Sequence, residues 1–363
     1  MKHHYLGLAA RKKGAWRQLF VHGSKYDLNH LKIYLQERYQ GETMLTKNGR
    51  SALALALKGY FEKGDKVIVN GFTCYAVYEA VKAAGLTPVF ADITKEDLNF
   101  SAETISKVAE GAKGIIIQNT LGNPVDIEAI EAFAKEKNLL IVEDLAHCVG
   151  INYRDGREAG TVGIATALSF GKDKSIDTIT GGAVIFRAPR KHEIKAPAKA
   201  PARSDNFRAR FYPMAGAMCR GLSYVHLGGA MMKLFLKFHM VEKSADNKLD
   251  LSVKPAKFEA KLALEQIKTL KNEKPLREFY LVRSRDEVLK KLKKAGYYFD
   301  GFWYEKPISP ARYYNKVHFP ESDCPVAVMV ASTIINFPTH YDKKELERAK
   351  EIVKEYLWTL TKS

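Results

Sequence analysis

Short apolar runs alternate with helix-like segments through residues 48–186 of the chain. Strands that are buried on both faces have such continuous apolar runs, so the alternation predicts an α/β fold with a mostly parallel sheet between helices. The predicted helices cover residues 51–60, 75–84, 103–110 and 127–137. The predicted strands cover residues 66–69, 88–90, 114–117, 139–142 and 165–170, and a last strand begins at Gly181-Gly182.

The pattern changes after residue 187. Residues 188–203 are rich in Pro, Ala and Lys and predict an exposed linker, and residues 207–240 are unusually apolar and basic. Helices are predicted at residues 258–270, 275–295 and 343–357. We therefore expect a large domain over residues 1–250, including an unusual insertion at about 188–250, and a smaller α+β domain over residues 251–363.

Chemistry-bearing side chains follow two of the predicted strands. Asp144 ends the strand at 139–142, while Ser169, Lys172 and Lys174 follow the next strand. Ligands of parallel sheets bind at the carboxyl ends of the strands. A lysine that can form a Schiff base and a carboxylate that can keep a pyridine nitrogen protonated suit pyridoxal 5'-phosphate (PLP). The residues alone leave Lys172 and Lys174 as competitors for the Schiff base.

A second group of residues suits the phosphate and the ring of this cofactor. Gly49, Arg50 and Ser51 begin a predicted helix, where backbone N–H groups, a hydroxyl and an arginine can bind a phosphate, and Ser169 can add a second hydroxyl. Thr73 and Tyr75 follow a strand and are placed at the cofactor edge. His147 follows Asp144 closely enough to stack on the ring. For Tyr75 and His147, core packing is an equally supported interpretation.

Composition narrows the function classes. The formal net charge is +17, which favours polyanions, phosphorylated substrates or anionic membranes as partners. No nucleic-acid recognition motif or aromatic platform accompanies the basic residues, so nucleic-acid binding is not expected. The four cysteines have no metal-type spacing and fit a reducing cytoplasm, and the basic N-terminus lacks the apolar run of a signal peptide.

The chain resembles the DegT/DnrJ/StrS family of sugar aminotransferases, PLP enzymes of the aspartate-aminotransferase fold (fold type I). The Schiff-base loop of the family has the spacing of Ser169, Lys174 and Gly181-Gly182, so the resemblance selects Lys174 over Lys172. Further elements that resemble family motifs are Asn48-Gly49-Arg50-Ser51-Ala52-Leu53, Gly64-Asp65-Lys66-Val67-Ile68-Val69, Phe72-Thr73, Gly122-Asn123-Pro124-Val125-Asp126, Glu143-Asp144-Leu145-Ala146-His147, Cys324-Pro325-Val326-Ala327 and Asn336-Phe337-Pro338-Thr339-His340.

The resemblance implies amino transfer, from glutamate to a keto group of a nucleotide-linked sugar, in the biosynthesis of cell-surface polysaccharides or other amino sugars. It also implies a homodimer with the active site at the interface. Family members commonly have an Asn and an Arg before the helix that matches residues 258–270, and this Asn reaches the cofactor phosphate of the partner subunit. This chain has Ser252 and Lys254 at these positions. Members that are dehydratases replace the lysine by histidine, and Lys174 argues against that variant.

Two other interpretations stay open from the sequence. One keeps PLP but assigns a lyase reaction, or a transamination of a carbonyl substrate without a nucleotide. The other is a non-catalytic homologue that contacts the inner face of a membrane through residues 207–240, where apolar positions lie beside Lys233 and Lys237. A dimer interface or a cover for the core explains the same apolar positions.

Overall fold

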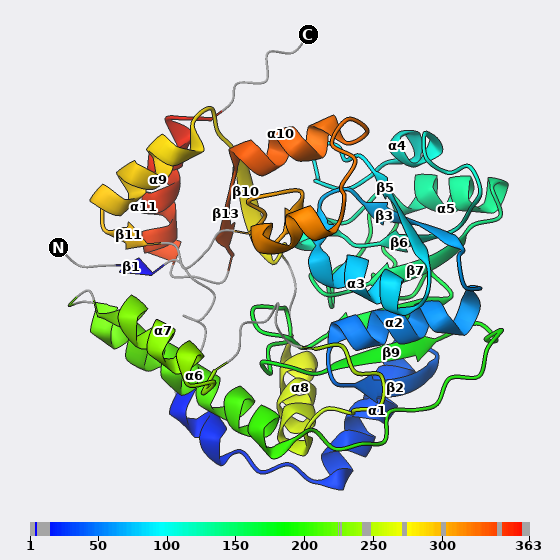
Figure 1. Cartoon of the computed structure of the whole chain (residues 1–363), viewed down its shortest axis with the longest axis horizontal. Coiled ribbons are helices and arrows are strands. Elements are labelled where there is room, and N and C mark those ends of the chain that lie inside the picture. The colour runs from blue at the N-terminus through cyan, green and yellow to red at the C-terminus, as the bar shows by residue number, and fades with distance from the viewer. Residues whose placement is uncertain are drawn as a thin grey trace.

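A seven-stranded sheet forms the centre of the large domain (Figure 1). The computed structural model describes residues 4–5, 15–223, 225, 227–241, 248–270, 274–298, 303–339 and 343–357. The strands lie in the order β2 (Glu42–Thr46), β9 (Gly182–Phe186), β8 (Ala165–Ser169), β7 (Leu140–Asp144), β6 (Ala112–Ile117), β3 (Lys66–Asn70) and β5 (Thr87–Ala91).

The strand pairing confirms the predicted mostly parallel α/β sheet. The pairs from β8 through β7, β6 and β3 to β5 are parallel, and β9 runs antiparallel to both β8 and β2. Alternate residues of one strand enter the two cores, as Ile116 and Ile115 do. A continuous apolar run in the sequence is therefore the consequence of helices on both faces.

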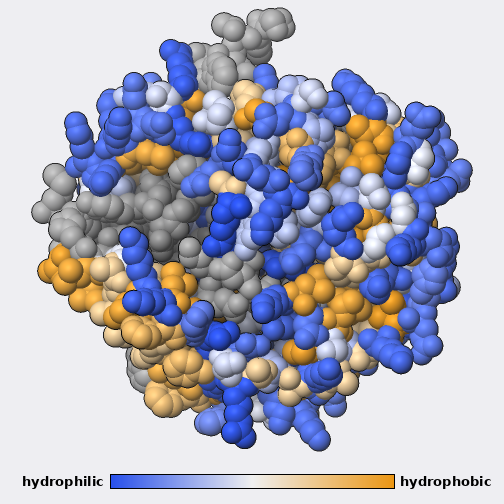
Figure 2. Space-filling model, viewed as in Figure 1, coloured by the Kyte–Doolittle hydropathy of each residue, from blue (hydrophilic) through white to orange (hydrophobic). Residues whose placement is uncertain are grey.

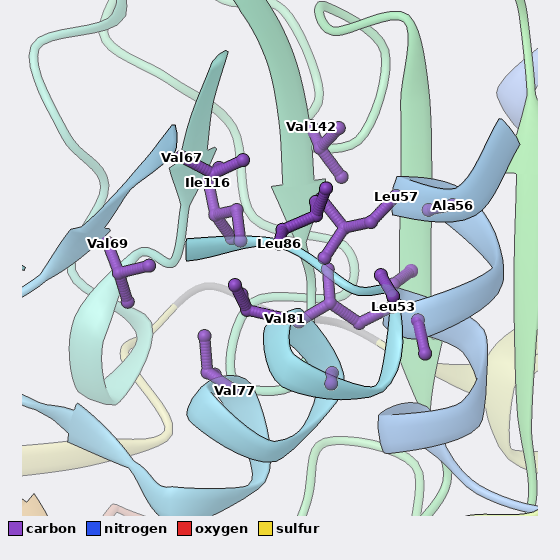
Figure 3. Close-up of a cluster of buried hydrophobic side chains, with 14 of the residues drawn as sticks. Leu53, Ala56, Leu57, Val67, Val69, Val77, Val81, Leu86, Ile116 and Val142 are labelled. Carbon is purple, nitrogen blue, oxygen red and sulfur yellow. The ribbon is translucent and has the colours of Figure 1, made fainter. Parts of the chain in front are cut away.

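Helices cover the two faces of this sheet (Figure 1). On one face, α2 (Gly49–Tyr60) and α3 (Tyr75–Ala83) pack on the strands, and Leu53 and Leu57 meet Val81, Ile116 and Val142 in Figure 3. The other face is covered by α1 (Lys25–Tyr39), α4 (Ala102–Ser106), α5 (Ile127–Glu136) and α8 (Lys257–Thr269). The helix predicted over residues 103–110 ends at Ser106 in the structure.

The prediction of one long helix over residues 275–295 is wrong. These residues form strand β10 (Arg277–Leu281) and then helix α9 (Arg285–Lys294). Strand β10 pairs antiparallel with β13 (Ile334–Pro338), and Val282 packs with Ile335 and Phe337 in a separate core. A partner strand far away in the sequence supplies the backbone hydrogen bonds, so local helix propensity does not decide here.

The remaining C-terminal elements complete this smaller unit. Helix α11 (Lys343–Lys354) packs beside α9, and α10 (Pro325–Thr333) packs on the core of the large sheet. The boundary at residue 250 stays a prediction. Apolar residues of α8 share a core with α1, which favours placing the boundary after α8. Short elements are β1 (His4–Tyr5), η2 (Ala15–Phe20), β4 (Thr73–Cys74), η3 (Thr120–Gly122), β11 (Tyr297–Tyr298), β12 (Ile308–Ser309) and η5 (Ala311–Lys316).

The unusual insertion forms a pair of helices at the edge of the molecule (Figure 1). An extended segment leads to α6 (Arg203–Ser223), and α7 (Gly228–Lys237) packs beside it. Among the described helices, none has the length and hydropathy needed to cross a membrane. The apolar residues of this region are therefore not explained by a membrane-spanning segment.

Candidate functional site

The predicted site residues lie at the carboxyl edge of the central sheet. Strands β7 and β8 are parallel neighbours, and Asp144 of β7 is in register with Ala167 of β8. Ser169 follows two residues after Ala167. The backbone N–H of Leu145 donates to the carbonyl of Ala167 at 2.8 Å. The ends of the two strands therefore bring Asp144 to the beginning of the Lys174 loop.

Lys174 lies in the loop between β8 and β9. The Thr178 N–H donates to the Phe170 carbonyl at 2.9 Å, and this bond closes the loop. The Lys174 Nζ lies 4.8 Å from the centre of the Trp303 ring. Burial lowers the pKa of Lys174, and the negative charge of Asp144 partly opposes this effect. A larger fraction of this amine is therefore neutral and nucleophilic than in a solvated lysine.

Asp144 and His147 lie next to this amine. Burial raises the pKa of Asp144, while the Ala146 N–H at 2.9 Å and the charge of Lys174 lower it. Burial and the cations Lys174 and Arg277 lower the pKa of His147 well below its ordinary value. The His147 Nδ1 accepts the Leu121 N–H at 3.2 Å, which suits a neutral imidazole. The site therefore combines a carboxylate, a neutral histidine and an amine with a lowered pKa.

The start of α2 lies against Ser169. A Cβ atom at Gly49 would lie 2.5 Å from the Ser169 Cβ, so only glycine permits this approach. Asn48 caps the helix by accepting the Ser51 N–H at 2.8 Å. The Ser51 hydroxyl accepts the Asp250 N–H at 3.1 Å. The predicted phosphate residues Gly49, Ser51 and Ser169 are thus brought together, with backbone of the insertion beside them.

Three other predicted residues have structural partners of their own. Arg50 forms an ion pair of 2.6 Å with Glu79. Tyr75 stacks on Tyr313 with ring centres 4.4 Å apart, and the buried Thr73 hydroxyl contacts Gln118. These contacts connect α2, α3 and β4 around the edge of the site. The cofactor roles of Arg50, Thr73 and Tyr75 stay predictions.

The sequence did not point to Trp303 or Arg277 as site residues. The Trp303 ring lies 5.0 Å from the His147 ring and 4.9 Å from the Arg277 guanidinium. The Arg277 Nη2 donates to the Asn336 carbonyl at 3.1 Å, and burial lowers the pKa of Arg277 to about 10. Asn336 also donates to the Trp303 carbonyl at 2.9 Å. The sequence signal that could have pointed to this region is the motif Asn336-Phe337-Pro338-Thr339-His340, because Asn336 contacts both Arg277 and Trp303. Its His340 lies outside the described residues.

Lys172 points toward helix α6, whereas Lys174 lies over Trp303. Its Nζ lies 2.6 Å from the Tyr212 hydroxyl of α6. Lys172 lines a separate cavity of about 40 Å³, together with Lys47, Arg208 and Lys254. Lys47 forms an ion pair of 3.0 Å with Asp205. The two competing lysines therefore have separate environments, and only Lys174 is coupled to Asp144 and His147.

These residues fit PLP by the chemistry of their side chains. Lys174 is the amine that would attach to the aldehyde, and Asp144 is the buried carboxylate that would bind a protonated ring nitrogen. The start of α2 with the hydroxyls of Ser51 and Ser169 is suited to a phosphate. The glycine at position 49 keeps this helix start close to Ser169.

Relatives of known name match a limited part of the chain. GDP-perosamine synthase of Escherichia coli O157:H7 is 38% identical over 140 residues, 38% of this chain and 38% of that protein. GDP-4-keto-6-deoxy-D-mannose 3-dehydratase of Yersinia pseudotuberculosis is 35% identical over 136 residues, 37% of this chain and 34% of that protein. The matches thus span little more than a third of each relative's length.

Solved structures share the fold over nearly the whole chain. The PLP form of the putative sugar aminotransferase Spr1654 from Streptococcus pneumoniae has a TM-score of 0.63 at 18% identity, covering 96% of this chain and 97% of that one. DesV of S. venezuelae, solved in complex with a ketimine intermediate, has a TM-score of 0.66 at 20% identity, with 98% of both chains covered. These likenesses confirm the predicted fold type I.

The model of one protein family covers residues 31–219, which include all the predicted site residues. Its description is the DegT/DnrJ/EryC1/StrS aminotransferase family, which agrees with the resemblance inferred from the motifs. The chain belongs to this family of aminotransferases.

Proposed function

We propose that this protein is a PLP-dependent aminotransferase that moves an amino group from glutamate to a keto sugar linked to a nucleotide. The observation that carries the proposal is the position of Lys174, whose pKa is lowered by burial, next to Asp144 and His147 at the strand ends. Membership of the family supports the reaction class. The expected role is in amino-sugar biosynthesis for cell-surface polysaccharides.

Each side chain has a defined task in this proposal. PLP, when bound, supplies an electron sink for the carbanion of the substrate. Lys174 is the residue that would hold the cofactor, and its Nζ would serve as general base and general acid. Asp144 would keep the ring nitrogen protonated, and the neutral His147 would contact the ring. Gly49, Ser51 and Ser169 would hold the phosphate.

A nucleotide-linked substrate is supported by two observations. The matched relatives include enzymes named for GDP-linked sugars. The cavity beside Lys172 is also lined by Lys47, Arg208 and Lys254, together with Asp205 and Glu259. Cations thus outnumber acids in its lining, which suits the phosphates of a nucleotide. We propose that this cavity receives part of that diphosphate while the keto group meets Lys174.

We further propose a homodimer in the cytoplasm. The four cysteines are free thiols in the structure, which suits a reducing compartment. Light scattering of the purified protein measures the oligomeric state. A monomeric protein with full activity would contradict the dimer without affecting the proposed reaction.

A half-reaction with glutamate tests the proposed activity. The purified protein is loaded with PLP, and its absorbance is followed after glutamate is added without a keto sugar. We expect the spectrum of bound PLP to change to that of pyridoxamine phosphate. A bound cofactor that stays unchanged would contradict transamination from glutamate and would favour a lyase reaction. Alanine as donor at the same concentration serves as the control for donor identity.

A further inference from the structure

Helices α6 and α7 form a pair whose inner faces are packed together. Phe211 of α6 meets Phe235 of α7 edge to face, with ring centres 5.3 Å apart. Ala215 and Cys219 are buried in the same cluster, and Met231, Met232 and Leu236 pack against it. The apolar residues of this cluster explain one face of α7 completely. They do not explain the exposed apolar residues on the flank of α7.

One exposed flank of α7 is also apolar. Leu227, Ala230, Leu234 and Phe238 follow one another at spacings of three, four and four residues, which places them in one stripe along the helix. Leu227 is 56% exposed, Leu234 46% and Phe238 63%. A surface helix of a globular protein normally has polar residues on its outer face. The stripe therefore needs a partner other than the core of this chain.

Neighbouring residues extend this stripe across both helices. The helix-pair surface, as we define it, consists of Phe207, Met218, Val225, Leu227, Leu234 and Phe238, all of which are exposed. Figure 2 shows apolar residues gathered along the lower left edge of the molecule, over α6 and α7. Lys233 and Lys237 are exposed beside the stripe. The surface is thus apolar in its middle and cationic along its side.

Positive charge predominates on the helix pair, although Asp205 in the first turn of α6 pairs with Arg208. Residues 206–241 contain five Arg or Lys residues and no Asp or Glu. A second copy of the chain would bring the same cations against one another, and like charges across an interface oppose association. An anionic lipid surface complements these cations, and exposed Leu and Phe side chains can enter the boundary between lipid headgroups and acyl chains.

We propose that the helix-pair surface docks this protein peripherally on an anionic lipid bilayer. The apolar stripe of α7 inserts at the headgroup level, and Lys233 and Lys237 contact the anionic headgroups. The described helices are unable to cross a membrane, so the helix pair lies along the bilayer surface. This inference is independent of the proposed reaction, because it uses no residue of the Lys174 site.

Vesicle flotation tests the proposed docking. The holoprotein is mixed with phosphatidylcholine vesicles that contain or lack phosphatidylglycerol, at low and at high salt. We expect flotation with the anionic vesicles, weakened by high salt. The double substitutions Leu234→Ser with Phe238→Ser, and Lys233→Glu with Lys237→Glu, should each reduce the bound fraction at least several-fold. Ile33→Ser, at a 51% exposed position on α1, is the matched control and should float like the wild type.

Folding and oligomeric state are measured in the same samples. All five substituted positions, including Ile33, are exposed, so the melting temperature and the cofactor content should stay as in the wild type. Absent flotation of the wild-type protein would overturn the proposal. It would also be overturned if Leu234→Ser with Phe238→Ser converted a dimer to monomers while vesicle binding was unchanged, because a second copy would then cover the stripe.

Discussion

The strand-end site and the helix pair both combine positive charges with apolar side chains, but they differ in burial. At the strand ends, burial lowers the pKa of Lys174 and raises the pKa of Asp144. On α7, Lys233 and Lys237 are exposed to solvent beside exposed leucine and phenylalanine. The comparison shows that burial shifts the pKa values of the charged side chains at the strand ends, whereas on α7 lysines and large apolar side chains stay exposed together at the surface.

One loop connects these two regions. Lys172 contacts Tyr212 of α6, while Lys174, two residues later, lies over Trp303 at the strand ends. Neighbouring lysines of one loop therefore belong to different environments. The predictions that follow compare matched residues of the two regions.

The largest effect is expected from removal of Lys174. Lys174→Ala should reduce transamination by about a thousand-fold or more, because the general base and the point of attachment are both lost. After reduction with borohydride, mass spectrometry should find the cofactor on the Lys174 peptide of the wild type. Lys172→Ala should keep this attachment. If Lys172→Ala abolishes it instead, the assignment of the two lysines is reversed.

A smaller effect is expected from shortening a side chain in the core. Leu57→Ala should lower the free energy of unfolding by about 3 kcal/mol, because Leu57 is fully buried between α2 and the sheet. Leu234→Ala removes the same atoms from the exposed stripe of α7 and should change it by less than about 0.5 kcal/mol. Denaturant titrations measure both values. Equal losses would show that the α7 stripe is covered in solution.

The smallest effect is a shift in the titration of Lys174. Its labelling by an amine reagent in the cofactor-free protein should rise with pH, with a midpoint below the ordinary lysine value of 10.5. The negative charge of Asp144 raises the pKa of Lys174, so Asp144→Asn should move the midpoint to lower pH. Mass spectrometry of the labelled peptide follows the titration, with the exposed Lys233 as the internal reference. A midpoint moved to higher pH would contradict the coupling.

Local pattern predicted most of the large domain because its contacts are repeated along the chain. Strands β3, β5 and β6 each have an apolar run, and helices α3, α4 and α5 follow them along the chain. Strand ends meet at one edge in any parallel sheet. Asp144, Ser169 and Lys174 could therefore be grouped before any coordinates were known. Strand β10 could not be predicted in this way, because its partner β13 lies more than fifty residues later in the sequence.

The sequence by itself determined the parallel sheet, the start of α2 at Gly49 and the pairing of an acid with a loop lysine, because these depend on short-range patterns. Only the tertiary structure decided which surroundings each lysine of that loop has, and that Trp303 and Arg277 from the C-terminal part contact the site. It also decided that α7 buries part of its apolar surface against α6 and leaves Leu234 and Phe238 exposed. Burial results from packing between segments that are distant in the sequence. It therefore determines both the lowered pKa of Lys174 and which apolar residues of α7 stay exposed.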